Sequence, residues 1–303
     1  FFRKNAGYPK YKSKRNKQSY TTNNQKGTIS FSTNDKYINI PKCRCIKIKK
    51  HRPNKGVIKH ATISKDCDGK YFISLCCIDD NEYSLPTTNN CVGIDLGIKK
   101  YVTLSNGKKI NNPKQLTKST KKLVREQRKL SHMKKGSNNY NKQRIIVARV
   151  HKKISNQRDD FIHKLTTELV KENQIICSET LNVSNMVKNH KLARSIEDAS
   201  WATFCSYLEY KCKKYGRTYI KVPNTYASSQ ICSCCGYKND LIKDLSIRNY
   251  ICPNCGAEID RDINASVNIL RKGLEIYNKA GTQPVSLLML DSLESSNKKP
   301  PLL

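Results

Sequence analysis

Apolar and polar residues alternate in short runs between Gly27 and about Tyr83, and Gly, Pro, Asn and Asp separate these runs. An alternation with a period of two is typical of strands that bury only one face. We therefore predict an antiparallel, barrel-like β-module over residues 27–90, ending in a linker. Residues 1–26 are polar and basic without such a period, so we interpret them as a connector. The clearest runs are Thr28–Ser32, Lys36–Ile40, Val57–Ser64 and Tyr71–Ile78.

The next stretch, residues 91–113, contains an apolar strand, a turn with glycine, a second strand and the pair Asn106-Gly107. Asn-Gly is a preferred pair in two-residue hairpins, so we expect a three-stranded meander. Residues 114–172 change to a helical and strongly basic pattern. The segment Gly136–Asn139 would separate two helices of a hairpin.

A buried strand is predicted over Gln174–Glu179, followed by a polar loop and a helix across about Asp198–Tyr215. Gly216 suits the position that ends this helix, because glycine adopts a left-handed backbone without strain. A further strand and a helix that opens near Asp260 complete the pattern. Beyond about Gly281 no core pattern remains, and we expect a poorly ordered tail.

The chain is very basic. Lysine and arginine number 57 against 24 acidic residues, so the formal net charge is +33 at pH 7. A field of this strength attracts polyanions and makes nucleic acid the first partner to consider. The excess is concentrated in residues 114–164, where sixteen basic residues accompany Glu126, Asp159 and Asp160.

An ordinary solvated surface is the alternative for this segment, but such a surface usually mixes both signs of charge. We therefore expect residues 114–164 to contact the nucleic-acid backbone. The residues predicted to make these contacts are Lys121, Lys122, Arg125, Arg128, Lys129, Arg144, Lys152 and Lys153.

Membrane association and secretion are not expected. No apolar run approaches the ~20 residues that span a bilayer. Fourteen cysteines in a chain of 303 residues that shows no signal-peptide pattern fit a reducing cytoplasm better than a disulfide scaffold. Nine of them lie in or beside apolar patterns, where free cysteine behaves as a small hydrophobic residue.

Two CxxC pairs stand out among the remaining cysteines. Cys232 with Cys235 and Cys252 with Cys255 are separated by sixteen residues, which is within the range of zinc ribbons. Two such knuckles bring four thiolates into one tetrahedral shell. Because protein ligands fill all four positions, we predict a structural zinc ion, with a disulfide or unbound cysteines as the alternative.

Three acidic residues are candidates for a second metal site. Asp95 lies inside an apolar strand, Glu179 ends a second one, and Asp262 stands at a helix start. A buried carboxylate is costly unless it is paired or binds a cation. Together the three could gather oxygen ligands for Mg²⁺ or Mn²⁺ in a phosphodiester-cleaving site. The ordinary alternatives are a turn cap, a solvated strand end and a helix N-cap.

Taken in order, these motifs resemble the OrfB/TnpB proteins of insertion sequences, which look like ancestors of the type V CRISPR effectors. The resemblance runs from about residue 1 to residue 272. It implies an α/β fold, namely an RNase H-like (RuvC) domain with helical-hairpin and zinc-ribbon insertions, preceded by a β-barrel-like wedge module. The motifs that carry it are Gly93–Lys99, Glu179–Met186, Tyr215–Arg217, Ser228–Gly236, Cys252–Gly256 and Asp260–Ala265.

The resemblance also implies that Asp95, Glu179 and Asp262 are the catalytic, metal-binding triad, with Asp260 as the second choice for the third position. The polar stretch Asn185–Arg194 would be a mobile cover over the cleft or a plain surface loop. The resemblance also implies a division of the chain. Residues 1–26 would be a connector or the remnant of a helical lobe, and residues 27–90 a wedge-like nucleic-acid-binding module. The RuvC domain would comprise residues 91–113, 173–230 and 257–272, interrupted by a basic helical segment (114–172) and a zinc ribbon (231–256) and followed by a tail (273–303).

The implied activity is that of a transposon-encoded, RNA-guided, divalent-metal-dependent DNA endonuclease. Its partners would be DNA and a guide RNA from the transposon end, in a prokaryotic cytoplasm and at the nucleoid when bound to DNA, as a monomer or ribonucleoprotein. The guide would read the sequence while Lys and Arg hold the heteroduplex. A non-catalytic DNA- or RNA-binding transposition regulator is the main alternative, and the presence of all three acids argues against it.

Members of this family carry more chain before the equivalent of Phe1. We therefore expect residues 1–303 to bind RNA and single strands, but to need upstream residues for guided cutting of duplex DNA.

Overall fold

The computed structural model describes residue 13, residues 18–243 and residues 247–279. Most of the expected connector and the expected tail beyond Gly281 lie outside these residues. The chain divides into two compact units, residues 1–82 with 121–153 and residues 83–120 with 154–303. Both contain helices and strands, as expected of an α/β protein. None of the described helices combines the length and apolar character needed to cross a bilayer.

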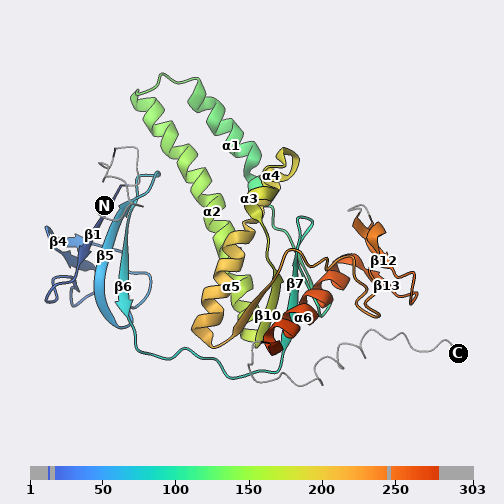
Figure 1. Ribbon diagram of the computed structural model, residues 1–303. Helices are drawn as coiled ribbons and strands as arrows, with labels where there is room; N and C mark the ends of the chain where they lie inside the picture. Colours follow the sequence, from blue (N-terminus) through green and yellow to red (C-terminus); the bar gives the residue numbers. More distant parts are fainter. Residues whose placement is uncertain (1–12, 14–17, 244–246, 280–303) are drawn as a thin grey trace, which may run out of the picture. The chain divides into compact units, whose positions relative to one another are not determined.

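The first unit contains six strands in two small sheets, β1-β5-β6 and β2-β3-β4 (Figure 1). All pairs are antiparallel, as predicted. Within the described residues they form two sheets instead of one closed barrel, and both sheets contribute to one core around Ile38 and Ala61. The strands are β1 (Gln18–Asn23), β2 (Ser30–Phe31), β3 (Tyr37–Ile40), β4 (Cys43–Lys47), β5 (Val57–Lys65) and β6 (Tyr71–Ile78).

Strand β1 corrects the interpretation of residues 1–26 as a connector without regular structure. Residues Gln18–Asn23 pair with β5 over their whole length. Five of the six side chains are exposed, so the strand lacks the apolar face from which an alternation could be recognised. Its Thr and Tyr residues nevertheless favour strands, and the Thr21 hydroxyl lies 3.0 Å from that of Thr62.

Helices α1 (Gln115–Ser131) and α2 (Asn138–Glu172) form the predicted hairpin, with Gly136 at φ +89° in the turn. A buried carboxylate, that of Glu126, joins them. Gln143 Nε2 donates to Glu126 Oε2 at 2.9 Å and to its carbonyl oxygen at 3.0 Å. Hydrogen bonds from Gln143 and Arg125 hold the pKa of Glu126 below its usual value. One buried acid of α1 is therefore hydrogen-bonded to α2.

The second unit is built on a five-stranded sheet in the order β11-β10-β7-β8-β9. The strands β7 (Cys91–Leu96), β8 (Lys100–Leu104) and β9 (Lys109–Asn111) form the predicted antiparallel meander. The strand β10 (Ile175–Glu179) runs parallel to β7, and β11 (Thr218–Val222) runs parallel to β10.

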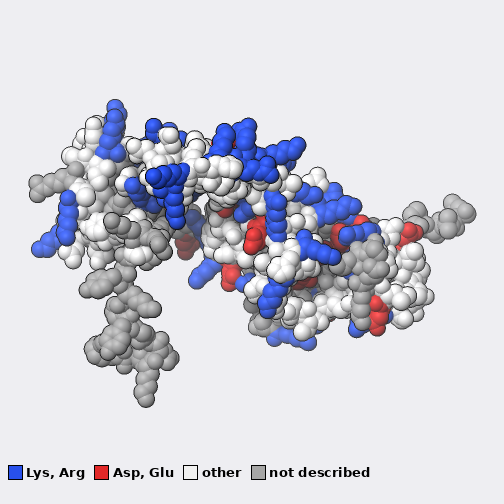
Figure 2. Space-filling view, turned by 90° about the horizontal axis from the view of Figure 1, so that it is seen from above, with Lys and Arg blue, Asp and Glu red and all other residues white. Residues whose placement is uncertain are grey.

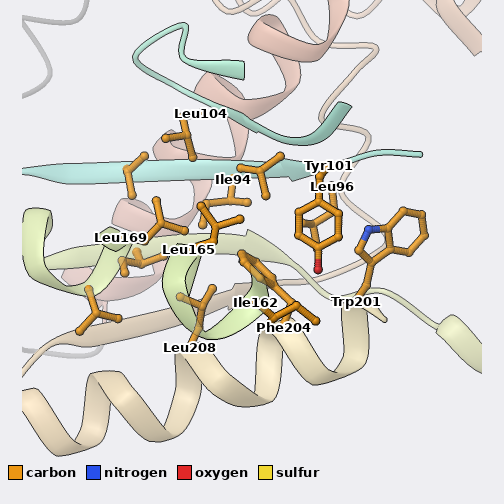
Figure 3. Packing of buried hydrophobic residues seen from close by; sticks show 14 of the residues in the cluster. Ile94, Leu96, Tyr101, Leu104, Ile162, Leu165, Leu169, Trp201, Phe204 and Leu208 are labelled. Carbon is orange, nitrogen blue, oxygen red and sulfur yellow. The ribbon is translucent and has the colours of Figure 1, made fainter. Parts of the chain in front are cut away.

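Helices cover both faces of this sheet. On one face, Ile94 and Leu96 of β7 pack with Ile162 of α2 and with Phe204 and Leu208 of α5 (Trp201–Tyr215), as Figure 3 shows. On the other face lies α6 (Arg261–Lys279).

Helix α6 approaches the sheet so closely that two positions must be glycine. A Cβ added to Gly93 would lie 2.0 Å from the carbonyl oxygen of Ser266. A Cβ added to Gly273 would lie 2.3 Å from Cys177 Sγ. Both distances are far inside van der Waals contact, so these glycines fix where α6 lies on the sheet.

The polar stretch after Glu179 is helical, which corrects its interpretation as a loop. Helices α3 (Val183–Met186) and α4 (His190–Ala199) each start at an asparagine, whose side chain accepts a backbone hydrogen bond at 3.2 Å. The helix expected from about Asp198 begins instead at Trp201, because Ser200 adopts a left-handed φ of 52°. Gly216 ends α5 with a φ of 66°, as predicted.

Candidate active site and metal centre

The carboxylates of Asp95 and Glu179 are brought together by two parallel strands. Strand β10 pairs with β7 so that Cys177 lies opposite Gly93 and Ser178 opposite Ile94. Continued by one residue, this register places Glu179 beside Asp95. Side chains two residues apart share a face of a strand. Both acids therefore lie on the face on which α6 packs at Gly93 and Cys177.

Asp262 reaches the same place from α6. Ser266 of this helix packs on Gly93, and Asp262 precedes Ser266 by four residues, about one helical turn along the same side. The charge of Asp262 raises the pKa of Asp95, as expected of two carboxylates on the same face of the sheet. Two strands and one helix thus bring three predicted acids together.

Burial and the neighbouring acids oppose the ionisation of Asp95. Burial raises the pKa of Asp95 well above its usual range, and the charges of Glu179 and Asp262 raise it further. Arg261 acts in the opposite direction. Burial also raises the pKa of Glu179. Half-buried carboxylates that repel one another are stabilised by a shared cation, so the cluster has the chemistry of an oxygen-ligand metal site.

The carboxylate of Asp260 is engaged differently. Its Oδ1 accepts the backbone amides of Asp262 at 3.1 Å and Ile263 at 3.2 Å, which caps α6. Its Oδ2 lies 2.6 Å from Lys109 Nζ. Burial acts to raise the pKa of Asp260, but the hydrogen bonds from Lys109 and Ile263 bring it below its usual value. Asp260 is therefore the N-cap of α6, and the Asp262 carboxylate remains available to bind a cation.

Lys109 and Arg261 adjoin this cluster although neither was predicted. The buried Arg261 lies between Asp260 and Asp262 in the sequence, and its Nη1 donates to the carbonyl oxygen of Ile247 at 3.3 Å. A basic residue directly between Asp260 and Asp262 was a recognisable signal. Nothing local distinguishes Lys109 among 57 basic residues, because only the folded sheet brings it to Asp260.

The four cysteines predicted to bind zinc converge. Their sulfur atoms lie within 4.8 Å of one another. Cys232 Sγ is 3.7 Å from Cys255 Sγ, and Cys235 Sγ is 3.5 Å from Cys252 Sγ. Four sulfurs held about 2.3 Å from a tetrahedral zinc ion would lie about 3.8 Å apart. The side chains present therefore fit a zinc ion.

Both knuckles have the same backbone geometry. The Cys232 amide donates to the Tyr237 carbonyl at 2.8 Å, and the Gly236 amide donates to the Cys232 carbonyl at 2.9 Å. The second knuckle repeats both bonds, starting from Cys252 and Gly256. The two glycines have φ values of +78° and +69°, which other residues rarely adopt. Strand β12 (Asn249–Ile251) leads into the second knuckle, and β13 (Glu258–Asp260), which pairs with β12, leads from the ribbon into α6.

The cysteine centre is buried on one side only. Cys232 and Cys252 are buried, whereas Cys235 and Cys255 are exposed. Asn254 Nδ2 lies 3.5 Å from Cys235 Sγ, and this hydrogen bond is the main cause that lowers the pKa of Cys235 to about 6. The thiolate, which is the form that binds metals, is thereby favoured at an exposed position.

The acids are less tightly gathered than the cysteines. Within the described part of the chain, the four cysteines are the one group of His, Cys, Asp or Glu residues that gathers this closely. Ligands around two cations about 4 Å apart need a wider arrangement than ligands around one ion. The two clusters therefore differ in size as well as in donor chemistry.

All eight basic residues predicted to contact nucleic acid are exposed on α1 and α2. Arg125 and Lys129 pair with Glu126, and Lys152 pairs with Asp66. The other five take part in no ion pair between described residues, so the hairpin retains a basic surface. Figure 2 shows Lys and Arg side chains outnumbering Asp and Glu on the face seen from above.

Two family profiles match the chain. Residues 74–190 match OrfB_IS605, described as “Probable transposase”. Residues 201–269 match the “Cas12f1-like, TNB domain”. The second match includes the four cysteines and the start of α6.

Curated relatives match over most of the chain. “Putative RNA-guided DNA endonuclease” of Streptomyces pristinaespiralis is 40% identical over 280 residues, which are 90% of this chain and 67% of that protein. “Putative RNA-guided DNA endonuclease InsQ” of Escherichia coli (strain K12) is 33% identical over 290 residues, covering 90% of this chain and 70% of that protein. “TnpB-like protein L770” of Acanthamoeba polyphaga mimivirus is 29% identical over 248 residues, or 77% of this chain and 47% of that protein.

A solved structure is also similar. “Cryo-EM structure of the Cas12f1-sgRNA-target DNA complex” contains a chain that matches with a TM-score of 0.45 and 19% sequence identity, over 69% of this chain and 55% of that chain.

Proposed function

The chain belongs to the OrfB/TnpB family, and from this membership we propose that it cuts DNA by divalent-metal-dependent hydrolysis under the direction of a guide RNA. Two curated relatives carry the name “Putative RNA-guided DNA endonuclease”, in one case followed by InsQ. The chain spans 67% and 70% of the length of these two relatives. The activity, substrate and partners of the whole protein are part of the proposal.

The observation that carries the proposal is the convergence of three acids from separate segments. Asp95 on β7 lies beside Glu179 on β10, on the sheet face that α6 covers, and the charges of Glu179 and of Asp262 on α6 raise the pKa of Asp95. The sheet order, with an antiparallel meander followed by two parallel strands, supports the interpretation of this unit as an RNase H-like (RuvC) domain.

Asp95, Glu179 and Asp262 would hold Mg²⁺ or Mn²⁺, and these ions, when bound, supply an activated water and stabilise the leaving 3′ oxygen of a phosphodiester. Asp260 caps α6 and so fixes the start of the helix that bears Asp262. Lys109 holds the Asp260 carboxylate from β9. The protein's own contribution is therefore the placement of three oxygen ligands.

We further propose that the cysteine centre holds a structural zinc ion within a zinc ribbon. Four protein ligands leave no position for a substrate or an activated water. The spacing of the sulfurs supports this assignment.

The exposed basic residues of the α1–α2 hairpin are proposed to hold the sugar-phosphate backbones of DNA and guide RNA, because lysine and arginine bind phosphates independently of sequence. The β-module of residues 27–90 is proposed to act beside them as the wedge-like nucleic-acid-binding part. The guide is proposed to come from the transposon end.

The test is cleavage by residues 1–303 with their co-purified RNA, on single-stranded DNA complementary to that RNA. Cleavage is expected in Mg²⁺ or Mn²⁺ and is expected to disappear in EDTA and in Asp95→Asn, with RNA retention unchanged. Glu275→Gln, which removes an exposed charge from the same helix as Asp262, is the matched control and should cut normally. Cleavage that persists in EDTA would reject the metal mechanism. RNA and DNA binding without cutting in any metal would favour a non-catalytic transposition regulator.

A further inference from the structure

A side-chain amide of α6 holds the backbone on both sides of Cys232. Asn264 Oδ1 accepts the amide of Ser233 at 2.8 Å, and Asn264 Nδ2 donates to the carbonyl oxygen of Ile231 at 2.7 Å. Ile231 and Ser233 are the direct neighbours of Cys232 in the chain. One asparagine of the helix that carries Asp262 therefore clamps the first knuckle of the cysteine centre.

The clamp continues along one face of α6. Asn268 Nδ2 donates to the carbonyl oxygens of Ser228 at 2.9 Å and Ile231 at 2.6 Å. Arg271 Nη2 donates to the Ser233 carbonyl at 2.9 Å. Positions 264, 268 and 271 share a helix face. Both asparagines are 0% exposed, and a buried amide without partners would be unfavourable, so these bonds resist separation of α6 from the knuckle.

The clamp restrains the rotation of α6 about its axis, on the side away from the close contact of α6 with the sheet at Gly93. Residues of an α-helix are about 100° apart, so Asn264 and Asp262 project in directions about 200° apart. A carboxylate about 5 Å from the axis moves by about 2 Å when the helix turns by about 20°. A displacement of about 1 Å at a reacting centre can lower a rate roughly 10²-fold. The position of Asp262 therefore depends on contacts made on the opposite side of its helix.

We propose that Asn264, assisted by Asn268, is a positioning residue that ties the Asp262 carboxylate to the first knuckle of the cysteine centre. This inference rests on the proposed role of Asp262 as a ligand of the catalytic cations. The cysteine centre then belongs to the framework of the acid cluster, and loss of the clamp weakens cation binding although no acid has changed.

The test is Mn²⁺ binding to the full, zinc-loaded chain, measured by electron paramagnetic resonance after RNA removal, with Asp95→Ala defining the background. Asn264→Ala is expected to weaken Mn²⁺ binding about tenfold and to slow cleavage at least as much, the usual range for residues that orient metal ligands. Its zinc content should stay at the wild-type value. Asn268→Ala, which lies farther from Asp262, should show a smaller loss of the same kind.

The matched control is Asn173→Ala. Asn173 Nδ2 donates to the Leu169 carbonyl at 2.9 Å at the end of α2, so this variant removes a similar bond far along the chain from the ribbon. Its Mn²⁺ affinity and cleavage rate should equal those of the wild type.

Wild-type Mn²⁺ affinity and cleavage in folded, zinc-loaded Asn264→Ala would overturn the inference. Should Asn264→Ala fail to fold, Asn268→Ala decides, and wild-type Mn²⁺ affinity in that variant would overturn it too. A wild type without any Asp95-dependent Mn²⁺ site would instead reject the proposed function, and with it this inference.

Discussion

The cysteine centre and the acid cluster are assembled from the chain in different ways. All four cysteines lie within residues 232–255, and two short turns gather their sulfurs within 4.8 Å. The three acids span residues 95–262 and come from two strands and a helix. The first site is thus assembled within one short segment, from two local turns and the small core between them. The second exists only after β7, β10 and α6 have packed, so its geometry depends on the whole unit.

The largest difference is expected between the two neighbouring acids at the start of α6. Asp262→Ala should lower single-turnover cleavage by at least ~10³-fold, because a metal ligand supplies several kcal/mol of transition-state stabilisation. Asp260→Ala should lower it only about tenfold, since losing a helix cap costs about 1 kcal/mol. The measurement is the cleavage rate of the RNA-bound protein at saturating Mn²⁺. The reverse order would identify Asp260 as the third ligand.

A second comparison uses two buried cysteines. Cys252→Ser should lower the zinc-to-protein ratio from one to near zero, because four ligands hold the ion together. It should also lower the midpoint of thermal unfolding more than Cys177→Ser does. Cys177 is buried beside α6 and lies outside the cysteine centre, so its variant should keep the zinc. Metal analysis after desalting and thermal unfolding test both points. Full zinc content in Cys252→Ser would contradict the zinc assignment.

The smallest effect concerns the stability of the cation-free protein. The pKa of Asp95 is higher in the folded state than the value of about 3.9 in the unfolded state, so folding favours the protonated carboxyl. This contribution to stability is fully present below the unfolded-state pKa. It is lost as the pH rises through the folded-state pKa. At pH 7 without divalent cations, Asp95→Asn should therefore raise the thermal midpoint by a few degrees.

The stability gain in Asp95→Asn should disappear near pH 4. Saturating Mn²⁺ should stabilise the wild type and leave the variant unchanged. Thermal unfolding at both pH values, with and without Mn²⁺, tests this comparison. A variant less stable than the cation-free wild type at pH 7 would show that Asp95 is not under electrostatic strain.

The features that could be predicted from the sequence are those determined by residues close together in the chain. The spacing of Cys232, Cys235, Cys252 and Cys255 was sufficient to predict their convergence, because each knuckle is a turn within four residues. Asp95 was recognisable as a charge inside an apolar strand. In both cases, the residues next to these positions in the chain were sufficient to identify them.

What sequence reasoning missed depends on contacts between distant segments. Asp262 was preferred to Asp260 from the sequence, but the contacts that distinguish the two acids were not predicted, because Asp260 caps α6 and meets Lys109, which lies about 150 residues earlier. Asn264 carries no signal of its own, since the groups that it holds lie more than thirty residues before it. Strand β1 was missed because it has no apolar face.

The central claim is that Asp95, Glu179 and Asp262 share bound divalent cations. A crystal structure of the zinc-loaded protein soaked in Mn²⁺, with anomalous scattering recorded for manganese, tests it most directly. Manganese is expected about 2.2 Å from carboxylate oxygens of all three residues, with Asp260 still bound to Lys109. Manganese held by Asp260 in place of Asp262, or no manganese at Asp95, would contradict it.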